Sequence, residues 1–419
     1  MKKIFVVALL AIILAVYIAV QPAHAQGDNI DVFIDNLPVS FNDVEPIIQD
    51  GRTLVPFRPI AEALNVEVNW DSGSQTINAL GEGVQVELVI GSETALLNQA
   101  PTQLEVGPQI IAGRTLVPLR FFSSAFGCAV EWIELSREIK IFTPPTKMAV
   151  IGFYALGDSR TSSWTNLFGL PYPDATRGNT DIVGTIALGW YSLDKDGNLL
   201  TESRTGWKRP EGWEDILSAA KKYTLQTEMV IHITDADNTI SCLLSSGDAM
   251  TRAIEATIGV AGLYGGVNLD FEGLGLSQSG EELEAVQQKY TLFVSMLAEK
   301  LRKLGKSLTL TVHPPNSEYK GYDYGKLAMA ADRIIIMAYD FGPKPEPINL
   351  VLEAVEMAMV DVPAEKIILG ISIPYETEKS IIPKVGLAKR YKLGGIALWR
   401  LGLISNETWS MLRSLIQAR

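Results

Sequence analysis

The segment from Gly265 to Glu272 reads GGVNLDFE, and polar and apolar side chains alternate along it. Neighbouring residues of a strand point to opposite faces, so the two sets are expected on opposite sides of the strand. This pattern suits the inner strand of a barrel, where apolar residues pack on an outer helix and a polar row leads to the C-terminal end. The polar set is Asn268, Asp270 and Glu272, and the apolar set is Val267, Leu269 and Phe271.

Two carboxylates at positions i and i+2 of one strand share a crowded site and cannot both ionise easily. One of Asp270 and Glu272 is therefore expected to keep its proton near neutral pH and to be able to act as a general acid.

Short runs rich in β-branched residues, bounded by turn residues, predict further buried strands after residue 147. They alternate with amphipathic stretches, the best defined of which runs from Leu283 to Leu304 and is followed by Gly305, a residue suited to ending a helix. Eight such units predict an α/β fold of the (β/α)8 TIM barrel type, with a doubly wound open sheet as the alternative. The expected strands are 148–154, 181–188, 229–233, 265–272, 308–313, 333–339, 366–371 and 394–399.

An internal repeat precedes this region. Residues 51–71, GRTLVPFRPIAEALNVEVNWD, align with residues 113–133, GRTLVPLRFFSSAFGCAVEWI. Each copy predicts a strand, a helical stretch and a second strand, so residues 26–142 are expected to form a small, duplicated α+β domain. The repeat arginines Arg52, Arg58, Arg114 and Arg120 are interpreted as forming ion pairs between the copies, with ligand binding as the alternative. Residues 143–147, which include Pro144 and Pro145, are predicted to be a linker.

The N-terminus has the pattern of an export signal. Lys2 and Lys3 precede an apolar run from Ile4 to Val20, and Ala23-His24-Ala25 matches the small-x-small cleavage pattern. Residues 1–25 are predicted to be a signal peptide, with an uncleaved membrane anchor as the alternative. The expected location is secreted, in the cell wall or the spore envelope.

Composition narrows the possible partners. The 419 residues carry a formal charge of -12, which disfavours nucleic acid and anionic membranes as partners. Cys128 and Cys242 fall in different predicted domains and are expected to be free, buried thiols.

Three motifs in order resemble glycoside hydrolase family 18: GGVNLDFE resembles the fourth-strand signature DGxDxDxE, MAYD at 337–340 closes the sixth strand, and Trp399 closes the eighth. The likeness covers about residues 148–419 and is nearest to spore cortex and cell wall N-acetylglucosaminidases. The duplicated GRTLVPxR motif resembles the domain named after the N-terminal region of copper amine oxidases. The repeat region has no histidine, so no copper site is expected there, and the domain is interpreted as non-catalytic and wall-associated.

The resemblance implies a substrate-assisted, retaining mechanism. Glu272 would protonate the glycosidic oxygen and later activate water, while the substrate's own 2-acetamido oxygen attacks the anomeric carbon. Asp270 would orient the acetamido group, and Tyr339 would donate a hydrogen bond to its oxygen. Trp399 would lie beneath the sugar as an apolar floor. The other predicted substrate-binding residues are Asn268, Asp340, Tyr154 and Trp190.

Two positions depart from the family pattern. Gly265 and Asn268 stand where the signature has Asp. Asn268 removes a buried negative charge from behind Asp270, to which its amide is expected to hydrogen-bond. The two histidines after residue 25, His232 and His313, are interpreted as hydrogen-bonding residues of the core or cleft, so neither a metal nor a cofactor is predicted.

The predicted substrate is a glycan that contains N-acetylglucosamine, cleaved at a β-1,4 bond. Residues 375–393 leave room for only one helix where processive chitinases of this family carry an extra domain. The cleft is therefore expected to be open, which favours peptidoglycan over chitin. The alternatives are a chitinase and a non-catalytic, lectin-like protein of the cell envelope.

Overall fold

The computed structural model describes residues 29–154 and 162–419. These divide into two compact units, one comprising most residues before Ile141 and the other comprising Phe142–Arg419 with the short stretches Ile34–Leu37 and Gly127–Ala129. The predicted signal peptide or anchor lies outside the described residues. Among the helices that the structure describes, none combines the length and apolarity needed to cross a bilayer.

The N-terminal unit is built around the repeat. Strand β4 (Arg52–Pro56), helix α2 (Phe57–Ala63) and strand β5 (Glu67–Asp71) form the first copy, and β11 (Arg114–Pro118), α3 (Leu119–Ala125) and β12 (Ala129–Ile133) form the second. The remaining strands of this unit are β1 (Asp31–Ile34), β2 (Leu37–Pro38), β3 (Ile47–Gln49), β6 (Thr76–Gly81), β7 (Val84–Val89), β8 (Thr94–Leu97), β9 (Ala100–Gln103), β10 (Gln109–Ile111) and β13 (Glu138–Phe142).

The two copies meet along β4 and β11, which pair antiparallel with Val55 opposite Val117. Their apolar residues are buried because the TLVP segments of both copies form the centre of one sheet, in the order β10-β11-β4-β3. The predicted ion pairs between copies are confirmed for two arginines. Arg52 pairs with Glu105, and Arg114 pairs with Asp43. Each acid lies nine residues before the GRTLVP arginine of the opposite copy.

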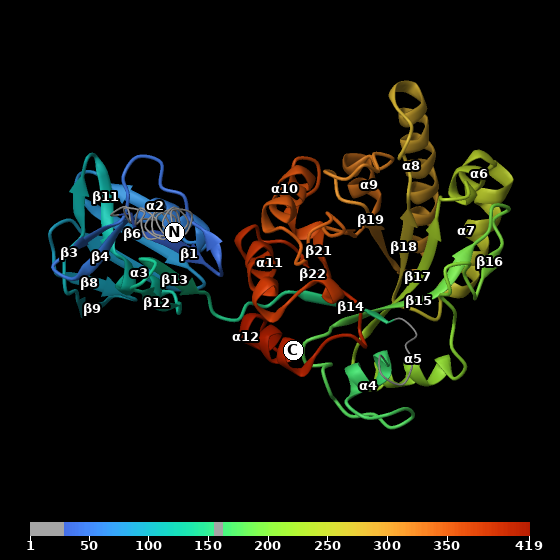
Figure 1. The fold of residues 1–419 in the computed structure, drawn as a ribbon, viewed down its shortest axis with the longest axis horizontal. Helices are drawn as coiled ribbons and strands as arrows, with labels where there is room; N and C mark the ends of the chain where they lie inside the picture. Colours follow the sequence, from blue (N-terminus) through green and yellow to red (C-terminus); the bar gives the residue numbers. More distant parts are fainter. Residues whose placement is uncertain (1–28, 155–161) are drawn as a thin grey trace, which may run out of the picture. The chain divides into compact units, whose positions relative to one another are not determined.

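The second unit is a closed barrel of eight parallel strands in the order β14-β22-β21-β20-β19-β18-β17-β15, closed by pairing of β14 with β15 (Figure 1). The predicted (β/α)8 fold is confirmed. The strands are β14 (Ala149–Tyr154), β15 (Thr185–Leu193), β17 (Gln226–Thr234), β18 (Gly266–Glu272), β19 (Ser307–Val312), β20 (Arg333–Ile336), β21 (Ile367–Ser372) and β22 (Gly395–Trp399), and a short β16 (Leu199–Leu200) pairs with the end of β15.

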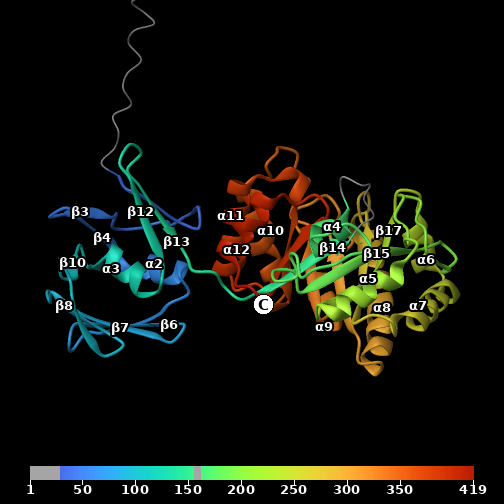
Figure 2. The same ribbon diagram turned by 90° about the horizontal axis from the view of Figure 1, so that it is seen from below.

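Helices surround the barrel, as both ribbon views show (Figures 1 and 2). The longest is α8 (Gly280–Lys303), where the repeat of apolar residues predicted a helix. Its buried face includes Phe293, Leu297 and Leu301, and Gly305 follows it with a φ of 65°. The other helices are α4 (Ser163–Phe168), α5 (Trp213–Lys222), α6 (Thr239–Ser245), α7 (Gly247–Ala261), α9 (Tyr324–Ala330), α10 (Ile348–Met359), α11 (Glu378–Arg390) and α12 (Asn406–Leu415), with 3-10 turns η1 (Ala364–Lys366) and η2 (Ile373–Tyr375).

Neither cysteine forms a disulfide, as predicted. Cys128 is buried, but Cys242 is exposed on α6, so the expectation of two buried thiols was wrong for Cys242. Within the barrel unit, the connection from β21 to β22 contains η2 and the single helix α11, so the short segment carries no additional domain.

Candidate active site

Strands β17 and β18 bring three ionisable side chains to the mouth of the barrel. These strands pair in parallel, with His232 opposite Asp270 and Thr234 opposite Glu272. The predicted alternation along β18 is confirmed. Its apolar residues Val267, Leu269 and Phe271 belong to the core between barrel and helices, so the polar row faces the barrel axis.

His232, Asp270 and Glu272 form one cluster. The Nε2 atom of His232 lies 3.3 Å from Oε1 of Glu272, and one ligand-type atom from each of the three residues lies within 4.8 Å of the others. Asp270 is only 3% exposed, whereas the Glu272 side chain is 30% exposed. Glu272 is therefore the member of the cluster that an incoming molecule can reach.

Burial sets the protonation of this cluster. Burial, together with the negative charge of Glu272, raises the pKa of Asp270 to about 8. Burial alone would lower the pKa of His232, but the hydrogen bond to Glu272 and the nearby charge of Asp270 raise it above its ordinary value. The cluster therefore retains protons at neutral pH. This agrees with the expectation that one acid of the pair stays protonated, and the structure places that effect on Asp270.

Oδ1 of Asp270 has no hydrogen-bond partner among the described residues. A buried acceptor without a partner is costly, so this oxygen is available to a donor from a bound molecule. The imidazole and two carboxylates also form a donor set that a divalent cation can use. The prediction of a metal-free site is not tested by this geometry and stays a prediction.

Asn268 belongs to a buried polar layer beneath the cluster. Its Nδ2 donates to Oε2 of Glu228 at 3.1 Å, and its Oδ1 accepts from the Thr311 hydroxyl at 2.8 Å. Oε1 of Glu228 accepts from Thr309 and Arg333. Both polar groups of the Asn268 amide are thus engaged away from Asp270. The expected hydrogen bond between Asn268 and Asp270 is not what the structure shows.

Tyr339 and Asp340 follow β20, which ends at Ile336. Tyr339 is partly buried, and burial together with Asp270 and Glu272 raises its pKa well above the ordinary value, so its hydroxyl remains a donor. Its ring lies close to Gly370, where an added Cβ would meet Cε1 at 3.2 Å. The Asp340 side chain is 65% exposed and lies 3.4 Å from Lys344 Nζ. The structure therefore places Tyr339 beside the acids but directs Asp340 to solvent.

Trp399 closes β22 and packs on the apolar layer inside the barrel. One ring face is covered by a residue that the sequence did not single out. Trp207 stacks on Trp399 with a centroid distance of 5.1 Å and on His232 at 4.7 Å. Gly189 makes room for this indole, because an added Cβ there would lie 2.0 Å from it. Thr205, in the same loop, contacts Nδ1 of His232 at 3.3 Å.

Two predicted sugar contacts were wrong. Tyr154 and Trp190 are 4% and 0% exposed and belong to the core between strands and helices. Trp190 packs edge-on against Trp213 and Tyr264. Tyr154 was expected at the end of the first strand and Trp190 after the end of the second. β15 includes Trp190, and the two-residue period directs both side chains outward. The inward neighbour of Tyr154 is Phe153, which packs edge-on against Trp399.

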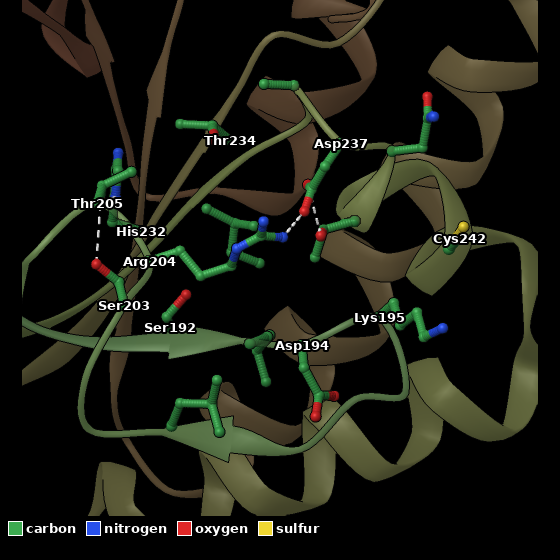
Figure 3. A pocket seen from close by; sticks show the side chains of 16 residues that line it. Ser192, Asp194, Lys195, Ser203, Arg204, Thr205, His232, Thr234, Asp237 and Cys242 are labelled. Atoms are coloured by element: carbon green, nitrogen blue, oxygen red, sulfur yellow. Dashed lines mark hydrogen bonds and ion pairs between the residues drawn. The ribbon is translucent and has the colours of Figure 1, made fainter.

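Of the three cluster residues, His232 also lines a pocket of about 650 Å³ (Figure 3). Besides His232, its wall includes Thr205 and an ion pair between Arg204 and Asp237. His313 lies outside the cluster, because its ring stacks on Tyr319 at 3.9 Å. Both histidines thus occupy core or cleft positions, but only His232 contacts the acids.

Two family models match the chain. Residues 33–141 match the copper amine oxidase N-terminal domain, and residues 200–373 match the glycosyl hydrolases family 18. The putative sporulation-specific glycosylase YdhD of Bacillus subtilis is 32% identical over 120 residues, which cover 26% of this chain and only 27% of that protein. The uncharacterized glycosylase YvbX of the same organism is 22% identical over 343 residues, covering 63% of this chain and 94% of that protein.

Solved structures share the barrel fold. The spore cortex-lytic enzyme SleL of Bacillus megaterium superposes with a TM-score of 0.53 at 18% identity, covering 65% of this chain and 75% of that one. A chitinase from Chromobacterium violaceum gives a TM-score of 0.53 at 17% identity, covering 64% of this chain and 98% of that one. At these low identities, the superpositions establish a shared fold alone.

Proposed function

We propose that this chain, which carries a glycoside hydrolase family 18 domain preceded by a copper amine oxidase N-terminal-like domain, is an exported glycosidase. It cleaves β-1,4 bonds next to N-acetylglucosamine, most readily in peptidoglycan. The observation that carries the proposal is the pair formed by Asp270 and Glu272. One carboxyl is buried with a free acceptor oxygen, and the other is accessible at the end of the same strand.

The reaction we propose is substrate-assisted and retaining. Glu272 donates its proton to the glycosidic oxygen while the acetamido oxygen of the substrate attacks the anomeric carbon, so the C–O bond to the leaving sugar breaks. When the sugar is bound, the proton shared within the cluster resides on Glu272, so Asp270 is ionised. Its free oxygen then accepts the acetamido N–H, and its negative charge balances the oxazolinium. The Glu272 carboxylate then takes a proton from water, and the water oxygen attacks the anomeric carbon. The bond between that carbon and the acetamido oxygen breaks, so the acetamido group is regenerated and the configuration is retained overall.

Two further residues complete this scheme. Tyr339 keeps its phenolic proton at neutral pH, so its hydroxyl can donate a hydrogen bond to the acetamido oxygen. Trp399 offers an indole at the base of the mouth, on which a sugar ring can stack. The indole of Trp207 covers one face of Trp399, so the loop that carries Trp207 moves when a sugar takes that face.

Peptidoglycan is favoured because the β21 to β22 connection holds only α11 and adds no wall to the cleft. An open cleft admits glycan strands with peptide branches. The names of two similar proteins refer to sporulation and to spore cortex lysis. These names support a wall polymer as the substrate. In this proposal residues 1–25 direct export, and the N-terminal domain holds the enzyme on the wall.

The test compares Glu272→Gln with a matched variant, Glu284→Gln, which changes an exposed glutamate on α8. Purified full-length protein is incubated with sacculi and with chitin oligomers, and the new reducing ends are identified. We expect Glu272→Gln to lose nearly all turnover while it still binds glycan, and Glu284→Gln to match the wild type. A wild-type protein that binds glycan and releases no reducing ends would instead be a lectin.

A further inference from the structure

The duplicated N-terminal domain contains two pockets at equivalent positions of the repeat. One has a volume of about 470 Å³ and the other about 580 Å³. The first is lined by Pro56, Arg58 and Trp70 of the first copy together with Gly113, Arg114 and Thr115 of the second. The second is lined by Pro118, Arg120 and Trp132 together with Gly51, Arg52 and Thr53. These are the same six motif positions with the copies exchanged.

Each pocket is therefore composite. Because β4 and β11 pair antiparallel with Val55 opposite Val117, the Gly-Arg-Thr turn of one copy faces the helix start and the tryptophan of the other. A single copy would supply only half of either pocket. Duplication is thus required to form the sites, as well as to bury the core.

The chemistry of the two pockets is also alike. Each contains a partly buried tryptophan, an arginine paired with an acid, and a second arginine. The paired arginines are Arg114 with Asp43 and Arg52 with Glu105. The second arginines, Arg58 and Arg120, are exposed, and neither donates a side-chain hydrogen bond within the described part of the chain. The charge of Arg120 helps to lower the pKa of Glu105, the acid already paired with Arg52.

Arg58 and Arg120 are hard to explain by folding. Ten of 21 positions are identical between the copies, and the core can account for buried ones such as Leu54 and Leu116. An exposed arginine without a hydrogen bond contributes little to stability. That both copies keep an arginine at this position, beside a tryptophan, points to a ligand.

We propose that these two pockets are equivalent binding sites for an anionic wall glycan, namely peptidoglycan strands whose lactyl-peptide groups carry carboxylates. The tryptophan stacks on a sugar face, and the exposed guanidinium of Arg58 or Arg120 pairs with a carboxylate of the glycan. This inference rests on the proposed function only in taking the enzyme's substrate as the polymer that the domain holds.

Two sites on one rigid domain suit a repeating polymer. Once one pocket is filled, the second binds a neighbouring segment of the same strand at high effective concentration, which raises overall affinity by roughly 100-fold or more. The formal charge of the chain is -12, so general attraction to a polyanion is unfavourable. Binding must then depend on the local arginines.

The experiment measures retention of the full chain on purified sacculi in a Glu272→Gln background, which removes turnover. Arg58→Ala and Arg120→Ala are the main variants, because exposed side chains without hydrogen bonds can be removed without unfolding. Trp70→Ala and Trp132→Ala are the second pair, checked by thermal melting. Arg302→Ala, an exposed arginine on α8, is the matched control. Sacculi stripped of phosphate polymers and uncharged chitin are the comparison ligands.

We expect each single-pocket variant to bind sacculi roughly 100-fold more weakly through loss of the second attachment. The double variant should bind more weakly still, and Arg302→Ala should match its parent. Stripped sacculi should retain the protein, and chitin should retain it less. Wild-type retention of either pocket variant overturns the proposal of two equivalent sites. Loss of retention on stripping would show that the ligand is a phosphate polymer and that the carboxylate assignment is wrong.

These results do not depend on catalysis. With Glu272 intact, the pocket variants should hydrolyse short soluble oligomers at the wild-type rate. If the wild type hydrolyses nothing, the proposed function fails, while retention on sacculi still decides whether the pockets bind glycan.

Discussion

The substitution Asn268→Asp, which restores the family signature at this position, is expected to destabilise the barrel. Asn268 is fully buried, and its amide donates to Oε2 of Glu228 at 3.1 Å. A carboxylate there would face another buried carboxylate at the same distance. With an effective dielectric constant of about 20, two such charges repel by about 5 kcal/mol.

The variant loses less stability if the introduced carboxyl group is protonated in the folded state. Holding an aspartic acid neutral at pH 7, when its unfolded-state pKa is about 3.9, costs about 4 kcal/mol, and the acid can then donate to Glu228. The introduced group therefore has a raised pKa in the folded state, so folding takes up a proton. The stability deficit grows as the pH rises above 3.9, by about 1.4 kcal/mol per unit.

Urea unfolding of the barrel at two pH values measures this effect. The free energy of unfolding should fall by about 4 kcal/mol at pH 7 and by about 1.5 kcal/mol at pH 5, relative to the wild type at the same pH. A second substitution, Glu228→Gln, should restore most of the loss. Its amide NH2 can donate to the new carboxylate, while its oxygen still accepts from Thr309 and Arg333.

Glu228→Gln alone is the control, because it sets two amide NH2 groups against each other and should destabilise by itself. A coupling energy of about 2 kcal/mol or more between the two substitutions is expected, within the range for contacting residues. If Asn268→Asp has wild-type stability at pH 7, or if Glu228→Gln lowers the stability of that variant further, the hydrogen bond between Asn268 and Glu228 does not stabilise the barrel.

Three further predictions concern the surroundings of the cluster. Trp207→Ala removes two ring stacks worth about 0.5–1.5 kcal/mol each and uncovers Trp399, so KM for oligosaccharides should fall about tenfold; an increase would mean that Trp207 itself binds the sugar. Glu346 is buried and accepts from the backbone N–H groups of the turn after Tyr339, so Glu346→Gln should lower kcat about tenfold in steady-state assays, and unchanged kcat would contradict this. Lys384 lies 2.7 Å from Glu376 in a buried pair, so Lys384→Met should cost about 3–5 kcal/mol by urea unfolding; a loss below about 1 kcal/mol would show that the pair is solvated.

The barrel could be predicted because parallel strands buried on both faces read as continuous apolar runs. All eight expected segments overlap observed strands. The exact strand ends could not be predicted, because apolar residues continue beyond the point where a run first weakens. Trp190 was misplaced because β15 continues past the expected end at residue 188 to Leu193. Residues within a strand alternate between its two faces, and this alternation directs Trp190 toward the helices. The end of β14 at Tyr154 was predicted correctly, but the same alternation directs the Tyr154 ring away from the barrel axis.

Contacts made by loops were not predictable either. Trp207 lies in an irregular segment between β16 and α5, where no periodic pattern indicates a direction. Its position depends on the absence of a side chain at Gly189 and on stacking with two rings, His232 and Trp399, that come from different strands. Only the folded barrel brings these together, so the covering of Trp399 was missed even though Trp399 itself was identified.

The surroundings of Asn268 were also not predictable from the sequence, because a residue on another strand supplies the charge next to it. From the sequence, replacing the signature aspartate removes a negative charge from behind Asp270. In the structure that layer still contains a carboxylate, because Glu228 enters it from the neighbouring strand, held by Arg333 and Thr309. The charge has moved to another strand, and an amide at 268 is the side chain that can donate to it. Asp270 therefore has no second acid directly behind it on its own strand, and the charges that shift its pKa are those of Glu272 and His232. We therefore expect a proton that Asp270 exchanges during the reaction to be shared with these two residues.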